Sequence, residues 1–317
     1  MEQLVLRLQR QLASAKQKSA NLVDAVHAAA RDAAIAVGVP AAVPAPAKDR
    51  RKKQPEVALL HLTDWQLGKL TSSYNSDVAV ERVAKTVQKT IRLAEIQRAD
   101  HPVRTCVVMV GGDLLENVGI FPGQAYEVDS TAFAQMFRCA QVLSDALLTL
   151  LEHFDAVEVH EVWGNHGRIG RKGEGPRGDN LDRMIGRLVR EQLAKQKRLM
   201  WHDTTSWHAI IKIGNYAALL VHGDQIRGGA LAIARKANAW ATGVTAPFQD
   251  MYLGHFHQCM TLTMANGGRV FMTPSTESGS EYAREFVGAL GRPGQRLHFV
   301  DPDRGRVTAE YLIWLAD

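Results

Sequence analysis

The chain has 317 residues, and its 46% hydrophobic and 22% charged residues are typical of a globular protein, which excludes a disordered or collagen-like chain. It has only three scattered cysteines, no apolar run near the ~20 residues that span a bilayer and no signal-peptide pattern, so we expect no disulfide framework, no membrane association and a cytoplasmic location. The formal net charge of +5 comes from residues 1–55, which contain ten Lys or Arg against four Asp or Glu, and this excludes a uniformly basic catalytic body.

The first 55 residues are predicted to form two segments outside the main domain. Residues 1–37 are predicted to form a helix, because Leu4, Leu8 and Leu12 begin a series with helical spacing. This helix either packs on the rest of the chain or mediates homo-oligomerisation. Residues 38–55 contain four prolines and include a basic run over residues 48–53, so they are predicted to be a semi-extended linker. The basic run is either simply solvated or contacts nucleic acid through phosphate charges.

Residues 56–317 are predicted to form one α/β domain, because short β-rich apolar runs alternate with longer helical patterns. The runs typical of strands cover residues 57–62, 106–110, 157–162, 217–221 and 251–253, and 306–315 is expected to be a final strand region. Helical spacing of apolar residues is found over 80–94, 133–147 and 181–193.

Each of the first five strand-like runs is followed by a turn that contains glycine and polar side chains. Ligands of open α/β sheets bind beyond the carboxyl ends of the strands, so these turns are expected to converge. Glycine permits the tight turns and close backbone approach that such a cluster needs. In chain order the turns contain Asp64-x-Gln66, Gly112-Asp113-x-x-Glu116, Gly164-Asn165-His166, His222-Gly223 and Gly254-His255-x-His257.

The residue types in these turns suit two neighbouring divalent cations. An ionised aspartate can bridge two cations, while asparagine offers an amide oxygen and histidine a neutral imidazole nitrogen. Two cations roughly 3.5–4 Å apart clamp the attacking and leaving oxygens of a phosphoryl group, and they lower the pKa of bound water. The pattern therefore points to metal-dependent hydrolysis of a phosphate ester.

The five motifs, in this order, resemble the calcineurin-like metallophosphoesterase superfamily. The resemblance extends from about residue 56 to the last strands, and it is closest to the repair-nuclease-like members of bacteria and phages. It implies a four-layer αββα sandwich of two mixed sheets, to which the N-terminal helix is an addition. The Asp-Arg-Gly ending of protein Ser/Thr phosphatases is missing, because Asp113 is followed by Leu114, Leu115 and Glu116. A protein phosphatase is therefore disfavoured.

The resemblance also assigns roles to individual residues. It implies that one metal is bound by Asp64, Gln66, Asp113 and His257, and the second by Asp113, Asn165, His222 and His255, with Asp113 as the bridge. It implies attack on phosphorus by metal-bound hydroxide. It further implies that His166 protonates the leaving group or steadies the transition state, and that Glu116 orients His166.

Two positions depart from the usual pattern of the superfamily. Gln66 stands where relatives usually have histidine, and its neutral, harder oxygen favours Mn²⁺, with Mg²⁺, Zn²⁺ and Fe²⁺ as alternatives. Gly167 stands where relatives often have an acidic residue, which leaves Glu116 as the expected support of His166.

The segment after His166 is basic and rich in glycine, and it is expected to be a mobile loop beside the reacting centre. Arg168, Arg171 and Lys172 are predicted to contact the substrate. The substrate is therefore predicted to be a phosphodiester in nucleic acid or in a nucleotide. Two other functions remain open at this point, namely a phosphomonoesterase on the same metals and a non-catalytic module in which Gln66 marks a decayed site.

Overall fold

The computed structural model describes residues 38–243, 246–279 and 291–316, together with isolated helical positions between 10 and 32. The predicted N-terminal helix, and with it the predicted role in oligomerisation, lies largely outside the described residues. Residues 38–55 contain no helix or strand. They follow the surface of the domain, where Gln196 accepts from the backbone N–H of Val43 at 2.9 Å and Arg198 donates to the carbonyls of Val43 and Pro44.

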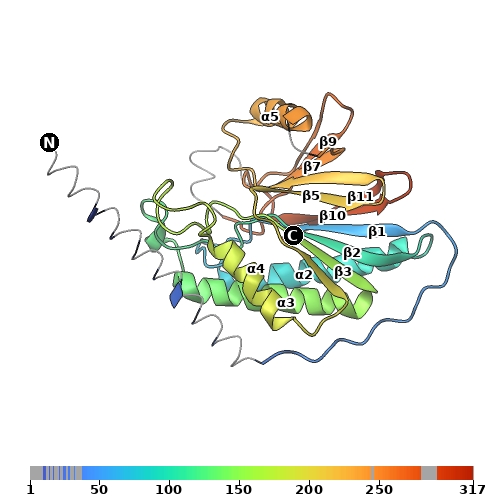
Figure 1. The fold of residues 1–317 in the computed structure, drawn as a ribbon, viewed down its shortest axis with the longest axis horizontal. Helices are drawn as coiled ribbons and strands as arrows, with labels where there is room; N and C mark the ends of the chain where they lie inside the picture. Colours follow the sequence, from blue (N-terminus) through green and yellow to red (C-terminus); the bar gives the residue numbers. More distant parts are fainter. Residues whose placement is uncertain are drawn as a thin grey trace.

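The strands form two mixed sheets that face each other (Figure 1). The first sheet has the order β11 (Arg306–Trp314), β10 (Gly294–Asp301), β1 (Glu56–Leu62), β2 (Val103–Val110), β3 (Ala156–Glu161) and β4 (Leu199–His202). Its strands β1 to β4 are parallel, whereas β10 and β11 are antiparallel. The second sheet has the order β5 (His208–Ile213), β6 (Tyr216–Val221), β7 (Asp250–Leu253), β9 (Arg269–Met272) and β8 (Met260–Thr263), with β6, β7 and β9 parallel.

The helices cover the outer faces of the two sheets, which makes four layers. Helices α2 (Ser76–Gln97), α3 (Ala132–His153) and α4 (Leu181–Gln192) cover the first sheet, and α5 (Ala230–Gly243) covers the second. Within the described part of the chain, no helix combines the length and apolarity required to cross a membrane. The predicted αββα sandwich is confirmed.

Alternating side chains of the central strands explain why both faces of the first sheet are buried. On β1, Leu60 and Leu62 pack under the helices, whereas Leu59 packs between the sheets. The sequences of such strands are continuous apolar runs, because a parallel sheet is covered on both faces. The helices begin at side-chain caps, as where Asn75 accepts from the backbone N–H of Val78 at the start of α2.

Within the described residues, the sequence predicted six of the eleven strands. The five predicted runs correspond to β1, β2, β3, β6 and β7, and the final strand region corresponds to β11. Strands β4, β5, β8, β9 and β10 and helix α5 were not predicted. Of these strands, β4, β8 and β9 have only four residues each, whereas β10 has eight. Strands that are short or that mix polar and apolar side chains have little periodicity in the sequence. They form because they pair with neighbouring strands of the sheet.

Candidate metal centre

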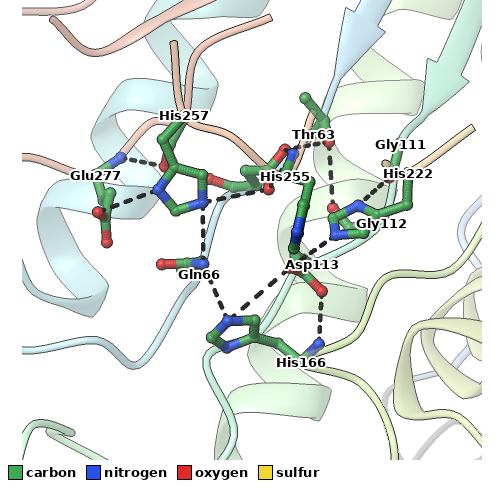
Figure 2. A network of polar contacts seen from close by, with 12 residues as sticks. Thr63, Gln66, Gly111, Gly112, Asp113, His166, His222, His255, His257 and Glu277 are labelled. Atoms are coloured by element: carbon green, nitrogen blue, oxygen red, sulfur yellow. Dashed lines mark hydrogen bonds and ion pairs between the residues drawn. The ribbon is translucent and has the colours of Figure 1, made fainter. Parts of the chain in front are cut away.

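The turns that follow β1, β2, β3, β6 and β7 meet at one end of the two sheets (Figure 2). Backbone hydrogen bonds join them, since the N–H of Asp64 donates to Gly112 and the N–H of Gly254 donates to His222, both at 3.0 Å. The backbone N–H of His255 also donates to the Asp64 carboxylate at 3.0 Å. The structure therefore brings together the five motifs that were expected to converge.

The backbone at this centre adopts conformations that side chains normally avoid. Among the described residues, six that are not glycine have a positive φ, and five of these are the predicted metal ligands Asp64, Gln66, Asp113, His255 and His257. The sixth, Asn117, donates through its amide to the carbonyl of His166 at 2.7 Å. A left-handed conformation costs a side-chain-bearing residue about 1–2 kcal/mol, and strain of this kind is concentrated at functional sites.

Two motif glycines are required because a carboxylate approaches their backbone closely. A Cβ atom on Gly164 would lie 2.0 Å from Oδ1 of Asp113, and one on Gly254 would lie 1.9 Å from Oδ2 of Asp64. Any larger residue at either position would displace a carboxylate of the centre.

Asp113, His222 and His255 form a close group of potential ligands, with one ligand atom from each within 4.8 Å of the others. The Nδ1 atom of His222 lies 2.8 Å from the carbonyl oxygen of Gly111, which can only accept, so Nδ1 carries the proton. The Nε2 atom of His222 therefore faces Oδ2 of Asp113 at 2.9 Å and Oδ1 of Asn165 at 3.2 Å. Apart from this contact with His222, the buried Oδ2 atom of Asp113 has no hydrogen-bonding partner. A divalent cation would displace a proton from Nε2 of His222, and the three side chains would then converge on it as ligands.

The electrostatics of this group favour positive charge between its members. Burial lowers the pKa of His222, but Asp113 outweighs burial and raises the pKa to about 10. The pKa of the Asp113 carboxyl is lowered, because His222 and His166 outweigh the effect of burial. His255 has a pKa of about 4, lowered by burial and then by His222, so its imidazole is neutral. A cation bound here would occupy a point where the protein already stabilises positive charge.

Asp64, Gln66 and His257 form the second half of the centre. Nε2 of His257 lies 3.3 Å from Oδ1 of Asp64 and 3.2 Å from the Gln66 amide. When that amide is turned so that its nitrogen donates to Glu277 at 2.8 Å and to Glu116 at 3.3 Å, its oxygen faces His257. An oxygen in this direction is suited to bind a cation, so Gln66 keeps the capacity of a ligand.

His166 lies between the two halves, as Figure 2 shows. Its Nδ1 atom lies 2.9 Å from the carbonyl oxygen of Glu116 and 3.4 Å from the Glu116 carboxylate. The ring of His166 is therefore supported by both the backbone and the side chain of Glu116. Its Nε2 atom faces the Gln66 amide at 3.4 Å and Oδ2 of Asp113 at 4.0 Å. The ring is thus oriented from outside and presents Nε2 to the centre.

The three predicted substrate-binding residues occupy different surroundings. Arg168 stays near the centre, because its guanidinium lies 4.7 Å above the ring of Phe121, and that ring is 5.2 Å from the His166 ring. Arg171 and Lys172 lie in an exposed loop. The backbone N–H of Arg171 donates to the Glu174 carboxylate at 2.7 Å, which closes this loop on itself.

The sequence reasoning missed Glu277 and Lys69, which form a buried ion pair of 2.6 Å beside Gln66. Glu277 also lies 3.2 Å from Nδ1 of His257, so it can hold this imidazole from behind. Burial lowers the pKa of Lys69, but the charges of Glu277 and Glu116 outweigh this and raise it, so the lysine is charged. Glu277 follows the carboxyl end of β9, and recognising that short strand would have identified it.

We expect Glu277→Gln to weaken binding of Mn²⁺ by about 10–100-fold, which is typical for loss of a group that supports a ligand. Glutamine can still accept from His257, but it removes the carboxylate that forms the ion pair with the Lys69 ammonium. Isothermal titration with Mn²⁺ measures the effect. Glu310→Gln removes the carboxylate that pairs with Arg269 and serves as the control. Equal Mn²⁺ affinity in Glu277→Gln and the parent chain would contradict this role.

Asp182, at the start of α4, is a second buried carboxylate that the sequence reasoning missed. It accepts from the backbone N–H groups of Asp113 at 2.9 Å, Leu114 at 3.1 Å and Gly164 at 2.9 Å, so it ties the turns after β2 and β3 together. Its pKa is raised to about 6 by burial and by the charge of Asp113. In the sequence it looks like an ordinary acidic residue of a first helical turn.

We expect Asp182→Ala to lower the free energy of unfolding by about 2–4 kcal/mol, because three backbone donors lose their acceptor. Asp182→Asn keeps one acceptor oxygen, so its loss should be smaller. Urea unfolding of both variants measures the difference. A stability for Asp182→Ala equal to that of the parent chain would show that the three N–H groups find other partners.

Comparisons with known proteins add a likeness of fold. No family model matches the chain, and no curated protein matches it either. Zinc-bound Vps29 from Entamoeba histolytica is 14% identical with a TM-score of 0.38, over 80% of this chain and 98% of its own. A phosphatase from Mycoplasma pneumoniae is 9% identical with a TM-score of 0.37, over 82% of this chain and 93% of its own. The phosphopantetheinyl hydrolase of Mycobacterium tuberculosis is 13% identical with a TM-score of 0.34, over 74% of this chain and 94% of its own. At these low identities and scores, a function has to rest on the geometry of the site itself.

Proposed function

We propose that the chain is a divalent-metal-dependent phosphoesterase, and more specifically a phosphodiesterase that acts on nucleic acid or on a nucleotide. The observation that carries this proposal is the convergence of seven ligand-type side chains with His166 between them. These are Asp64, Gln66, Asp113, Asn165, His222, His255 and His257. Left-handed backbone at five of the seven supports a functional rather than a purely structural role.

In this proposal the seven ligands would hold two divalent cations, most favourably Mn²⁺, and Asp113 would be a ligand of both. When bound, these cations supply Lewis-acid activation of water and neutralise charge on the phosphoryl oxygens. The strained, hydrogen-bonded turns keep the ligands in place before any substrate arrives, which reduces the reorganisation required during the reaction.

His166 is proposed to act as the general acid. Its Nδ1 atom donates to the Glu116 carbonyl, which fixes the ring, so that a proton held on Nε2 points into the centre. The Asp113 carboxylate accepts from the backbone N–H of His166 at 2.7 Å and couples the position of this residue to the ligands. As the oxygen of a water molecule bonds to phosphorus, the bond from phosphorus to the leaving oxygen breaks, and the Nε2 proton of His166 passes to that oxygen.

The proposal of a nucleoside-containing substrate rests on the surroundings of His166. A leaving group that takes its proton from His166 must lie next to Phe121 and Arg168, because the Phe121 ring is in contact with both side chains. An aromatic ring beside a guanidinium suits a nucleoside, which offers a base for stacking and further phosphates for charge pairing. A nucleoside leaves from a phosphodiester of nucleic acid and equally from a nucleoside monophosphate, so the comparison of diester and monoester substrates decides between the two.

Hydrolysis of bis-p-nitrophenyl phosphate and of p-nitrophenyl phosphate tests this function after removal of metals with a chelator. Adding back Mn²⁺, Mg²⁺ or Zn²⁺ should restore turnover, with the diester preferred and Mn²⁺ most effective. DNA, RNA and cyclic nucleotides then identify the substrate class. A clear preference for the monoester would establish a phosphomonoesterase instead. Absence of both turnover and metal binding would indicate a non-catalytic module.

We expect Arg168→Ala to lower kcat/KM for a nucleotide diester by about 10-fold, which corresponds to ~1.4 kcal/mol of lost charge pairing. The effect should appear mainly in KM, because the arginine contacts the part of the substrate that does not react. Steady-state kinetics with bis-p-nitrophenyl phosphate and a dinucleotide measure it. Arg306→Ala, on the exposed β11, is the control. Unchanged kinetics of Arg168→Ala would remove this residue from the substrate site.

A further inference from the structure

A second group of metal-ligating side chains lies on β3 and on β4, which is an edge strand of the first sheet. Glu158 and His160 are two residues apart on β3 and therefore point to the same face, opposite to Val157 and Val159, which pack under the helices. His202 on β4 is the register partner of His160. The three side chains thus gather on one face of a pair of parallel strands.

The contacts within this group are close. The rings of His160 and His202 are stacked, with centroids 4.1 Å apart and planes within 3°. Nε2 of His202 lies 3.4 Å from the Glu158 carboxylate. One ligand atom from each of the three residues lies within 4.8 Å of the others.

We propose that Glu158, His160 and His202 form a second, separate binding site for a transition-metal ion of the Zn²⁺ type. Two imidazoles and a carboxylate are a set of three protein ligands that Zn²⁺ accepts, and its fourth position is left to solvent. Imidazole ligands disfavour Mg²⁺ and Ca²⁺, which prefer oxygen.

The state of His160 supports this assignment. Among the described residues, the ring of His160 forms no side-chain hydrogen bond, although only 8% of the residue is exposed. An almost buried ring without a hydrogen-bonding partner keeps its nitrogen atoms available to a metal ion.

Binding requires a small rearrangement, because stacked parallel rings do not direct their nitrogens to a common point. His202 has the room to turn, since 48% of its side chain is exposed, and its Nε2 atom already faces Glu158. The bound ion would then join the four-residue edge strand β4 to β3. Strand β3 leads directly to Asn165 and His166, so the ion would stabilise the support of the proposed catalytic centre without touching the substrate.

The test is a count of Zn²⁺ bound by the full chain after loading and removal of excess metal, measured by mass spectrometry of the metal. The parent chain should hold one more Zn²⁺ than either His202→Gln or His160→Ala. A Zn²⁺-dependent rise in Tm should be reduced in both variants by the loss of this ion. His101→Ala is the matched control, because His101 is also a surface histidine beside a carboxylate, 3.1 Å from Asp100, but has no second imidazole.

The exposed edge position of His202 makes His202→Gln tolerable for folding, and circular dichroism without metal checks this. Equal Zn²⁺ content in the parent chain and both variants would overturn the proposal, and so would an equal loss in His101→Ala. The count does not depend on phosphoester hydrolysis, so it stands even if the proposed function fails. Where hydrolysis is measured, His202→Gln should leave it unchanged in Mn²⁺.

Discussion

Asp113→Asn is expected to lower kcat/KM for the diester by on the order of 10³-fold or more and to reduce the metal content of the chain. The two ends of the Asp113 carboxylate face different partners, the backbone N–H of His166 at 2.7 Å and Nε2 of His222 at 2.9 Å. Asparagine keeps the shape but removes the charge that two cations would share. Lewis-acid stabilisation is worth several kcal/mol, and ~4 kcal/mol corresponds to the expected loss in rate.

Kinetics and metal analysis on the same preparation check this result. Asp129→Asn is the matched control, because Asp129 caps the start of α2 and binds Ser76 rather than a residue of the centre. Activity and metal content of Asp113→Asn close to those of the control would refute the proposed bridging ligand. The function itself would then have to rest on another site.

His166→Ala is expected to lower kcat by about 10²–10⁴-fold, which is the usual contribution of a general acid, while the metal content stays near normal. The reason is that His166 is oriented by Glu116 and presents Nε2 to the centre, yet is not needed to hold the ligands. The loss should be greatest for substrates with a poor leaving group. An alkoxide depends on protonation, whereas p-nitrophenolate leaves without it.

A series of diesters with leaving groups of increasing pKa measures this dependence. His101→Ala, a surface variant, is the control for the loss of a histidine. Loss of metal from His166→Ala would show that the residue acts as a ligand and not as an acid. An equal loss of rate across the whole series would also rule out the role as acid.

The sequence was sufficient for the parts of the fold that carry strong periodicity. Strands β1 and β2 are long apolar runs, and α2 and α3 have one apolar face, so their positions could be predicted within a few residues. Short strands such as β9 could not be found in this way. As a consequence, Glu277 behind β9 was missed, although it lies 3.2 Å from the predicted ligand His257.

The resemblance of the motifs identified the ligand types, but the supporting contacts depend on the tertiary structure. Glu116 was expected to orient His166 through its carboxylate, which lies at 3.4 Å, whereas its backbone carbonyl is closer at 2.9 Å. Asp182 accepts from three backbone groups in two separate turns, and nothing in its local sequence distinguishes it from an ordinary helical aspartate.

The sequence by itself determined which side chains follow each strand, because a strand and the turn after it are local features of the chain. It thereby determined the chemistry available at the centre, namely carboxylates, amides and imidazoles. Only the tertiary structure decided how these groups are held, through the left-handed backbone of the ligands and through the buried partners Glu277, Lys69 and Asp182. Contacts between residues far apart in the chain are decided by the packing of the two sheets, and no local pattern records them.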